Sequence, residues 1–117
     1  MADKAPARVT SLSAAKFMPR FEYGHMAQAS VVTGTGEDGT RLGSGFVRMK
    51  DASIPWTVQY DEVILVLEGE LTVRTRDGDL RAGPMDCIWL PNGTELTYVA
   101  VSALMFYAIE PANWAEG

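Results

Sequence analysis

The chain has 117 residues, of which 47% are hydrophobic, and a formal net charge of −5. This length and hydrophobicity indicate one folded domain and exclude a disordered chain. The negative charge argues against nucleic-acid and membrane-surface partners, because both select proteins with a basic face.

Two features bear on the compartment in which the protein works. No apolar run is long enough to span a bilayer, and the first residues lack the apolar stretch of a secretory signal. The single cysteine, Cys87, excludes an intrachain disulfide and suits a reducing compartment. We therefore expect a cytoplasmic protein that has neither nucleic acid nor a membrane as its partner.

An all-β domain is predicted to follow a short N-terminal arm. Residues 1–16 are rich in Ala, Ser and Lys, which indicates a flexible arm with one short helical turn at Ser11–Lys16. Residues 17–117 alternate short apolar or aromatic runs with turn residues, which predicts a single antiparallel barrel. The expected strands are Gln28–Val32, Leu42–Met49, Trp56–Tyr60, Glu62–Arg74, Asp79–Ala82, Asp86–Leu90, Glu95–Val101 and Leu104–Glu110.

Tight turns are predicted at three dipeptides that accept a positive φ: Asp38-Gly39, Asp77-Gly78 and Asn92-Gly93. Asp77-Gly78 is the clearest hairpin signal, since alternating strand residues flank it on both sides. No long segment has helical periodicity, which argues against a parallel sheet with crossover helices.

Two of these strands are apolar at both odd and even positions, namely Val63–Leu67 and Ala103–Ile109. Successive side chains of a strand point to opposite faces, so both faces of these strands need cover. One face lies in the barrel interior, and we expect a second copy of the chain to cover the other in a homodimer. The alternative is a flattened sandwich whose own halves, with the N-terminal arm, supply all the cover.

The segment Trp56–Gly69 places Glu62 seven residues before a glycine that ends a strand. This spacing resembles the first metal-binding motif of cupins, in which two histidines one residue apart precede the glutamate. Trp56 and Val58 occupy those two histidine positions in this chain.

A second segment, Asp86–Gly93, resembles the Asp-x4-Pro-x-Gly core of the second cupin motif, and Leu96 stands at its histidine position. The resemblance implies a cupin-type antiparallel jelly-roll barrel in which three of the four metal ligands have been replaced. We therefore expect neither a bound metal nor another cofactor.

A closer resemblance covers roughly the last two thirds of the chain. It is carried by Gly43–Phe46, Pro55–Thr57, Tyr60–Glu62, Leu67–Glu70, Ile88–Pro91 and Pro111–Trp114. These segments resemble the cupin domain of ethanolamine-utilisation proteins of the EutQ type, whose members also lack the histidines. The resemblance implies a role in ethanolamine or related amine utilisation, with acetate-kinase activity attributed to some members. Those proteins usually carry an extra N-terminal region, and a function that needs it is not implied here.

If the strand positions follow the cupin pattern, Trp56, Val58, Glu62 and Leu96 line one pocket. Burial in apolar surroundings disfavours the charged carboxylate, so the pKa of Glu62 should rise into the range useful for proton transfer. The alternative is a structural carboxylate that binds a tyrosine hydroxyl or a backbone amide.

Other side chains supply candidate polar groups for the same pocket. Tyrosines offer phenolic hydroxyls, and His25 is a candidate base if the N-terminal arm folds over the barrel mouth. The expected catalytic residues are Glu62, Tyr60, Tyr107 and His25, and the expected ligand contacts are Trp56, Val58, Leu96 and Tyr98.

Three functions remain open from the sequence. The first is a cupin that binds a small polar metabolite (an amine, aldehyde or carboxylate) and acts on it by metal-independent acid–base catalysis of the lyase or isomerase type. The second is a non-catalytic ligand-binding or assembly partner of an amine-catabolic complex. The third is an enzyme with an unusual metal site made of Glu62, His25 and one of the tyrosines, a combination of residue types that ectoine synthases use.

Overall fold

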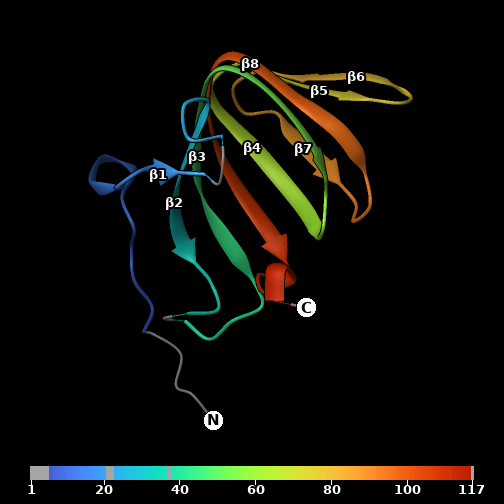
Figure 1. Cartoon of the computed structure of the whole chain (residues 1–117). Coiled ribbons are helices and arrows are strands. Elements are labelled where there is room, and N and C mark those ends of the chain that lie inside the picture. The colour runs from blue at the N-terminus through green and yellow to red at the C-terminus, as the bar shows by residue number, and fades with distance from the viewer. Residues whose placement is uncertain (1–5, 21–22, 37, 117) are drawn as a thin grey trace.

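Two long antiparallel strands organise the molecule, which is described here from a computed structural model covering residues 6–20, 23–36 and 38–116. In chain order the elements are η1 (Leu12–Ala14), β1 (Met18–Pro19), β2 (Ala27–Thr33), β3 (Gly43–Thr57), β4 (Asp61–Gly69), β5 (Leu71–Thr75), β6 (Gly78–Ala82), β7 (Cys87–Leu90), β8 (Glu95–Glu110) and η3 (Trp114–Glu116). The strands form one eight-stranded sheet that curls into a barrel (Figure 1). The prediction of an all-β antiparallel barrel is confirmed. No helix in the described part of the chain is long and apolar enough to cross a membrane.

The strand order is β1-β2-β3-β8-β4-β7, and β5 pairs with both β6 and β8. Strands β3 and β8 pair along their whole length, from Gly43 opposite Ile109 to Thr57 opposite Glu95. The first half of β8 pairs on its other edge with β5 and the second half with β4. The pair β3–β8 therefore runs through both halves of the barrel and joins them.

The predicted breaks within these two strands were wrong. Gaps were expected between Met49 and Trp56 and between Val101 and Leu104, but the ladder continues through both, with Lys50 opposite Ser102 and Ala52 opposite Ala100. Asp51 has a φ of 45°, in the left-handed region, and lies at the middle of β3. An aspartate tolerates this conformation better than most residues, so the strand changes direction there without ending.

The single strand predicted over residues 62–74 is in fact two strands. Gly69 ends β4 with a φ of 76°, and a Cβ at this position would collide with the carbonyl oxygen of Ser102. Only glycine fits both conditions, so the chain turns at Glu70 before β5 begins. The predicted hairpin is present as β5–β6, but Thr75 pairs with Gly78, which puts the two-residue turn one position earlier than expected.

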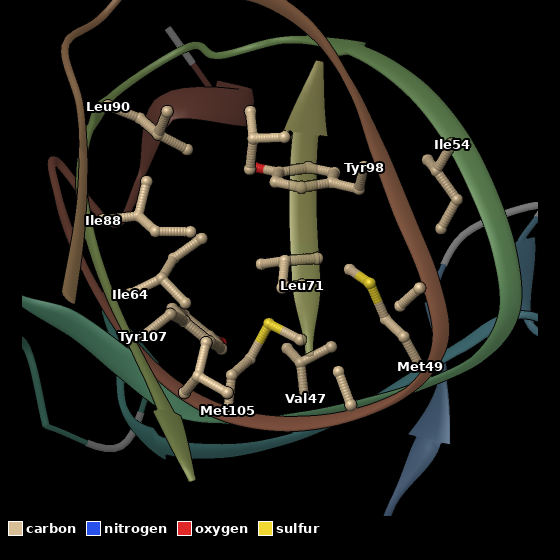
Figure 2. Close-up of a cluster of buried hydrophobic side chains, with 14 of the residues drawn as sticks. Val47, Met49, Ile54, Ile64, Leu71, Ile88, Leu90, Tyr98, Met105 and Tyr107 are labelled. Carbon is tan, nitrogen blue, oxygen red and sulfur yellow. The ribbon is translucent and has the colours of Figure 1, made fainter. Parts of the chain in front are cut away.

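Inward-pointing side chains fill much of the barrel, as Figure 2 shows for residues that come from strands all around the wall. Val47 and Met49 of β3 lie opposite Met105 and Ala103 of β8, and all four are buried. This alternation of buried and exposed residues is the period of a sheet with one face in a core.

The N-terminal arm lies against the outside of the barrel in its described part. Arg8 forms an ion pair with Asp38, with 2.9 Å between Nη1 and Oδ1, and donates to the carbonyl oxygen of Val32 at 2.7 Å. The predicted helical turn appears as the short η1. Residues 1–5 of the predicted arm lie outside the described residues.

Candidate functional site

The barrel interior holds a cavity of about 270 Å³, close to the lower end of the range for small-molecule sites. Its apolar wall consists of Ala27, Val47, Met49, Ile54, Ile64 and Met105. Its aromatic and polar groups are Arg20, Tyr23, Trp56, Tyr60, Glu62, Tyr98, Tyr107 and Trp114. A few polar groups in a mostly apolar hollow are typical of a site that orients a small polar ligand.

The polar side chains reach this cavity from different parts of the sheet. Glu62 is the second residue of β4, where it lies opposite Leu90 of β7 and Ile109 of β8. Tyr98 and Tyr107 both belong to β8, one in each half of that bent strand. Tyr60 precedes β4, two residues before Glu62. Because β8 spans both halves of the barrel, it carries two phenols into the same hollow.

Glu62 is a buried carboxyl group with 6% of its surface exposed. The Tyr98 hydroxyl donates a hydrogen bond of 3.0 Å to its Oε1. Burial raises the pKa of Glu62 to about 7, and the Tyr98 hydrogen bond and the Arg20 charge counter only part of that rise. A carboxyl group with this pKa populates both its acid and its base form near neutral pH.

The phenols are shifted in the same sense. Burial, with the nearby Glu62 charge, raises the pKa of Tyr60 to about 12. Burial also raises the pKa of Tyr98 well above its usual value, and it raises that of Tyr107. The Arg20 guanidinium reaches the hydroxyls of Tyr60 and Tyr107, and hydrogen bonding to it counters part of the rise in both pKa values. All three phenols are therefore neutral donors near neutral pH.

An aromatic cluster forms one side of the cavity. The Trp114 ring packs against Trp56 with centroids 5.6 Å apart and an interplanar angle of 78°, and against Tyr60 at 5.3 Å and 57°. The Trp56 Nε1 donates a hydrogen bond of 3.2 Å to the Tyr60 hydroxyl. These contacts bring the C-terminal segment against β3 and against the loop before β4.

The structure brings together most, but not all, of the residues predicted for the site. Trp56, Tyr60, Glu62, Tyr98 and Tyr107 all line the cavity.

Three predicted residues lie elsewhere. Val58 and Leu96 are buried but do not line the cavity, and His25 is exposed and also lies outside the lining. Strand β3 ends at Thr57, and Val58 exchanges backbone hydrogen bonds with the turn at Gly93 and Thr94 while its side chain packs in the core. These three predicted roles have no support from the geometry.

Arg20 is a cavity residue that sequence reasoning missed. It follows β1, a strand of only two residues whose Met18 pairs with Ala29. The Arg20 amide then bonds to the carbonyl oxygen of Ala27, which fixes the point at which the side chain leaves the backbone. A two-residue strand has no readable periodicity, so only the fact that Arg20 is charged and next to a proline was visible beforehand.

The side chains at the usual cupin ligand positions do not fit a metal ion. The Trp56 indole nitrogen is a hydrogen-bond donor, and Val58 and Leu96 carry only carbon atoms in their side chains. Within the described ranges, no three or more His, Cys, Asp or Glu residues are grouped so that they could hold a metal. The alternative set with His25 is not assembled, because that imidazole lies outside the cavity.

An antiparallel jelly-roll barrel with the motif glutamate in its interior defines this chain as a cupin. The solved structure of an RmlC-like cupin from Shewanella frigidimarina NCIMB 400 has this fold, with a TM-score of 0.72. The match covers 96% of this chain and 97% of that chain at 12% identity. The predicted fold class is confirmed.

The family model described as ethanolamine utilisation protein EutQ matches residues 7–116, and the chain belongs to this family. The acetate kinase EutQ of Escherichia coli (strain K12) is 40% identical over 81 residues, which are 68% of this chain and 35% of that protein. A crystal structure of ethanolamine utilization protein Q from Salmonella typhimurium LT2 has a TM-score of 0.81 at 31% identity, covering 90% of this chain and 86% of that one. The chain thus spans about a third of the length of the E. coli relative. The resemblance to EutQ proteins is confirmed.

Proposed function

We propose that the barrel binds a small polar metabolite of amine utilisation and acts on it by metal-independent acid–base catalysis. Glu62 is the proton-transferring group in this proposal. The supporting observation is a carboxyl group that lines a mostly apolar cavity and titrates at about pH 7. General acid–base catalysis is most efficient when the catalytic pKa lies near the working pH.

The neighbours of Glu62 support the same reading. Tyr98 holds one carboxyl oxygen by a hydrogen bond of 3.0 Å, which fixes the orientation of the group. The apolar wall disfavours the ionised carboxylate and raises the pKa of Glu62 to about 7, so its acid and base forms are both available near neutral pH. A proton moved to or from a small carbonyl compound or amine is the chemistry of a lyase or isomerase step.

Hydrogen–deuterium exchange at carbon tests this proposal directly. The chain is incubated in D2O with ethanolamine, acetaldehyde, acetate and acetyl phosphate, the last two chosen because the E. coli relative is named an acetate kinase. Loss of C–H signals is followed by NMR for the wild type and for Glu62→Gln. We expect at least one compound to exchange with the wild type and not with the variant. Equal rates for both proteins with every compound would refute the catalytic role.

A non-catalytic ligand-binding protein is the second candidate, and the aromatic cluster of Trp56, Tyr60 and Trp114 favours it. Such a cluster is a preformed wall for a flat or cationic ligand. A thermal-shift screen of the same compounds, run beside the exchange experiment, separates the two. Saturable stabilisation without exchange would support this candidate.

We also propose that two chains form a homodimer through the outer face of β4 and β7. Val63 and Trp89 lie opposite each other on these strands, and they are 44% and 58% exposed. Leu65 and Phe106 are the next outward pair and are half-buried. Exposed apolar side chains gathered across neighbouring strands mark interaction surfaces, and a symmetric dimer buries such a patch against its own copy.

Sedimentation velocity at micromolar concentration tests the dimer. The wild type should sediment as a dimer, and Trp89→Glu should sediment as a folded monomer. Val101→Glu is the matched control, because it changes another exposed apolar residue away from β4 and β7. A monomeric wild type would contradict this part of the proposal.

A further inference from the structure

The direction of the hydrogen bonds at Tyr60 is fixed by the types of its neighbours. An indole N–H and a guanidinium donate hydrogen bonds and accept none. The Tyr60 oxygen therefore accepts from Trp56, at 3.2 Å, and from Arg20. Its own proton has no acceptor among the described residues, although only 1% of the residue is exposed. Tyr60 is thus a buried donor that lines the cavity and finds no acceptor in the described part of the chain.

The Tyr107 hydroxyl is also a donor that has no acceptor among the described residues. Its hydroxyl oxygen interacts with the Arg20 guanidinium, and no side chain or carbonyl in the described ranges accepts its proton. The residue is 7% exposed and lines the cavity. Gly45 makes room for this position, since a Cβ there would lie 2.8 Å from the Tyr107 hydroxyl.

Glu62 supplies the complementary group. Its Oε1 accepts the Tyr98 bond, and its Oε2 has no partner among the residues that the structure describes. In the same ranges no fully buried polar side-chain atom is without a hydrogen-bond partner. The free carboxyl oxygen is therefore not sealed in the core, and Glu62 and Tyr107 both line the cavity. The cavity presents two phenolic donors and one carboxyl oxygen to whatever it binds.

From this arrangement we infer that the ligand is a small carbonyl compound whose oxygen accepts hydrogen bonds from Tyr60 and Tyr107. The inference rests on the proposed function and names the substrate class of the same site. The ligand carries a hydrogen on the carbon next to the carbonyl carbon, and this hydrogen faces Glu62 Oε2. Arg20 is a positioning residue: it holds both phenol oxygens, so their protons point into the cavity.

The reaction step balances without a further reagent. Glu62 Oε2 takes the proton, the C–H electron pair becomes a carbon–carbon double bond, and the carbonyl π pair moves to the oxygen. The resulting enolate oxygen is stabilised by the two phenolic hydrogen bonds, which strengthen as negative charge develops on it. The protonated Glu62 then returns the proton to the same carbon, which restores the carbonyl compound and the carboxylate. Donors placed for a developing oxyanion are a large source of rate acceleration in such reactions.

Binding of 4-nitrophenol tests the donor pair without knowledge of the substrate. Its phenolate resembles an enolate oxygen and absorbs visible light, whereas its phenol form does not. Titrations are run at one pH unit below the pKa of the free probe, where most free probe is neutral. We expect the wild type to bind it as the phenolate, and Tyr60→Phe and Tyr107→Phe each to weaken binding about tenfold or more, the usual effect of losing a hydrogen bond to a charged group. The isosteric 4-nitroaniline, which has no oxyanion, should bind weakly.

The inference is overturned if the wild type binds the probe in its neutral form or not at all, or if it binds 4-nitroaniline equally well. These results are measured on the wild type alone, so they remain decisive even if Tyr60→Phe or Tyr107→Phe fails to fold. Glu62→Gln distinguishes the donor pair from the proposed catalysis. This variant should still bind the phenolate, but it should not catalyse hydrogen–deuterium exchange at carbon. Phenolate binding without exchange would refute the catalysis and leave the donor pair standing. Exchange that persists in Tyr60→Phe and Tyr107→Phe would refute the donor pair alone.

Discussion

The Tyr98 hydroxyl donates a hydrogen bond of 3.0 Å to the Oε1 of Glu62, across 36 residues of sequence. This bond joins β8 to β4 inside the barrel and leaves the other carboxyl oxygen directed to the cavity. A carboxylate that accepts one hydrogen bond in an apolar hollow remains poorly stabilised, and its proton is therefore held more tightly than in water. The pair combines a fixed orientation with a pKa of about 7 for Glu62.

Removing the donor of this pair should raise the pKa of Glu62 further. The Tyr98 bond lowers that pKa, so Tyr98→Phe removes a stabilising interaction of the charged form. A hydrogen bond to a charged group contributes about 1.5–3 kcal/mol, which corresponds to an increase of roughly one to two pKa units. Titration of the carboxyl carbon by ¹³C NMR measures the change. A pKa that falls or stays constant would show that the bond does not act on the ionised form.

The raised pKa of Glu62 should make unfolding depend on pH. The folded pKa of about 7 exceeds the ordinary glutamate value of 4.5, so the folded state holds this proton more tightly than the unfolded state does. Its contribution is present in full below pH 4.5 and is lost as pH rises towards and through about 7. The difference between the two pKa values corresponds to about 3 kcal/mol.

Glu62→Gln removes this titration, so its stability relative to the wild type should increase between acidic and mildly alkaline pH. Chemical denaturation at a series of pH values measures the difference, with Glu68→Gln, an exposed position on the same strand, as the control. A constant difference between Glu62→Gln and the wild type would contradict the raised pKa.

Gly45→Ala should destabilise the fold and displace Tyr107. An added Cβ would lie 2.6 Å from the carbonyl oxygen of Ser30 and 2.8 Å from the Tyr107 hydroxyl, so β2 and the phenol must both move. Overpacking of this kind costs about 1–3 kcal/mol. Gly36→Ala is the matched control, because no atom lies within 4 Å of its added Cβ. Equal unfolding free energies for the two variants would be inconsistent with the packing at Gly45.

Trp114→Ala should open the cavity to solvent. The ring contacts Trp56 and Tyr60, and each aromatic pair contributes about 0.5–1.5 kcal/mol, so the variant should lose about 1–3 kcal/mol in stability. When Trp114→Ala is made in a Trp89→Phe background, Trp56 is the remaining tryptophan. Acrylamide should quench its fluorescence more strongly than in the Trp114→Phe variant of the same background. Trp114→Phe keeps an aromatic ring and is the comparison. Unchanged quenching in the alanine variant would mean that the C-terminal segment does not shield the cavity.

Much of this site was predictable because its residues belong to a local pattern. Glu62 occupies a motif position on a strand, and Tyr98 and Tyr107 alternate inward along β8. Arg20 was not predictable, because its place depends on a two-residue strand that pairs with β2 through contacts distant in sequence. Val58 points inward as its motif position predicted, but it packs in the core and does not line the cavity, a distinction that motif spacing does not carry.

The strand boundaries failed for a related reason. Polar residues such as Lys50 and Asp51 resemble a turn in sequence, yet a long strand carries them when they lie on its outer face or at a bend. Conversely, the strand predicted over residues 62–74 ran through Gly69, where a positive φ and a close backbone approach make the chain turn. Side-chain polarity reports burial, whereas these boundaries depend on backbone conformation.

The pKa of Glu62 in the wild-type chain tests the central claim most directly. Glutamate labelled with ¹³C at the carboxyl carbon is titrated by NMR, and the Glu62 resonance is assigned by its absence in Glu62→Gln. We expect a midpoint near pH 7 for this resonance. A midpoint near 4.5, the value for an ordinary glutamate, would show a solvated carboxylate and contradict the proposed acid–base site.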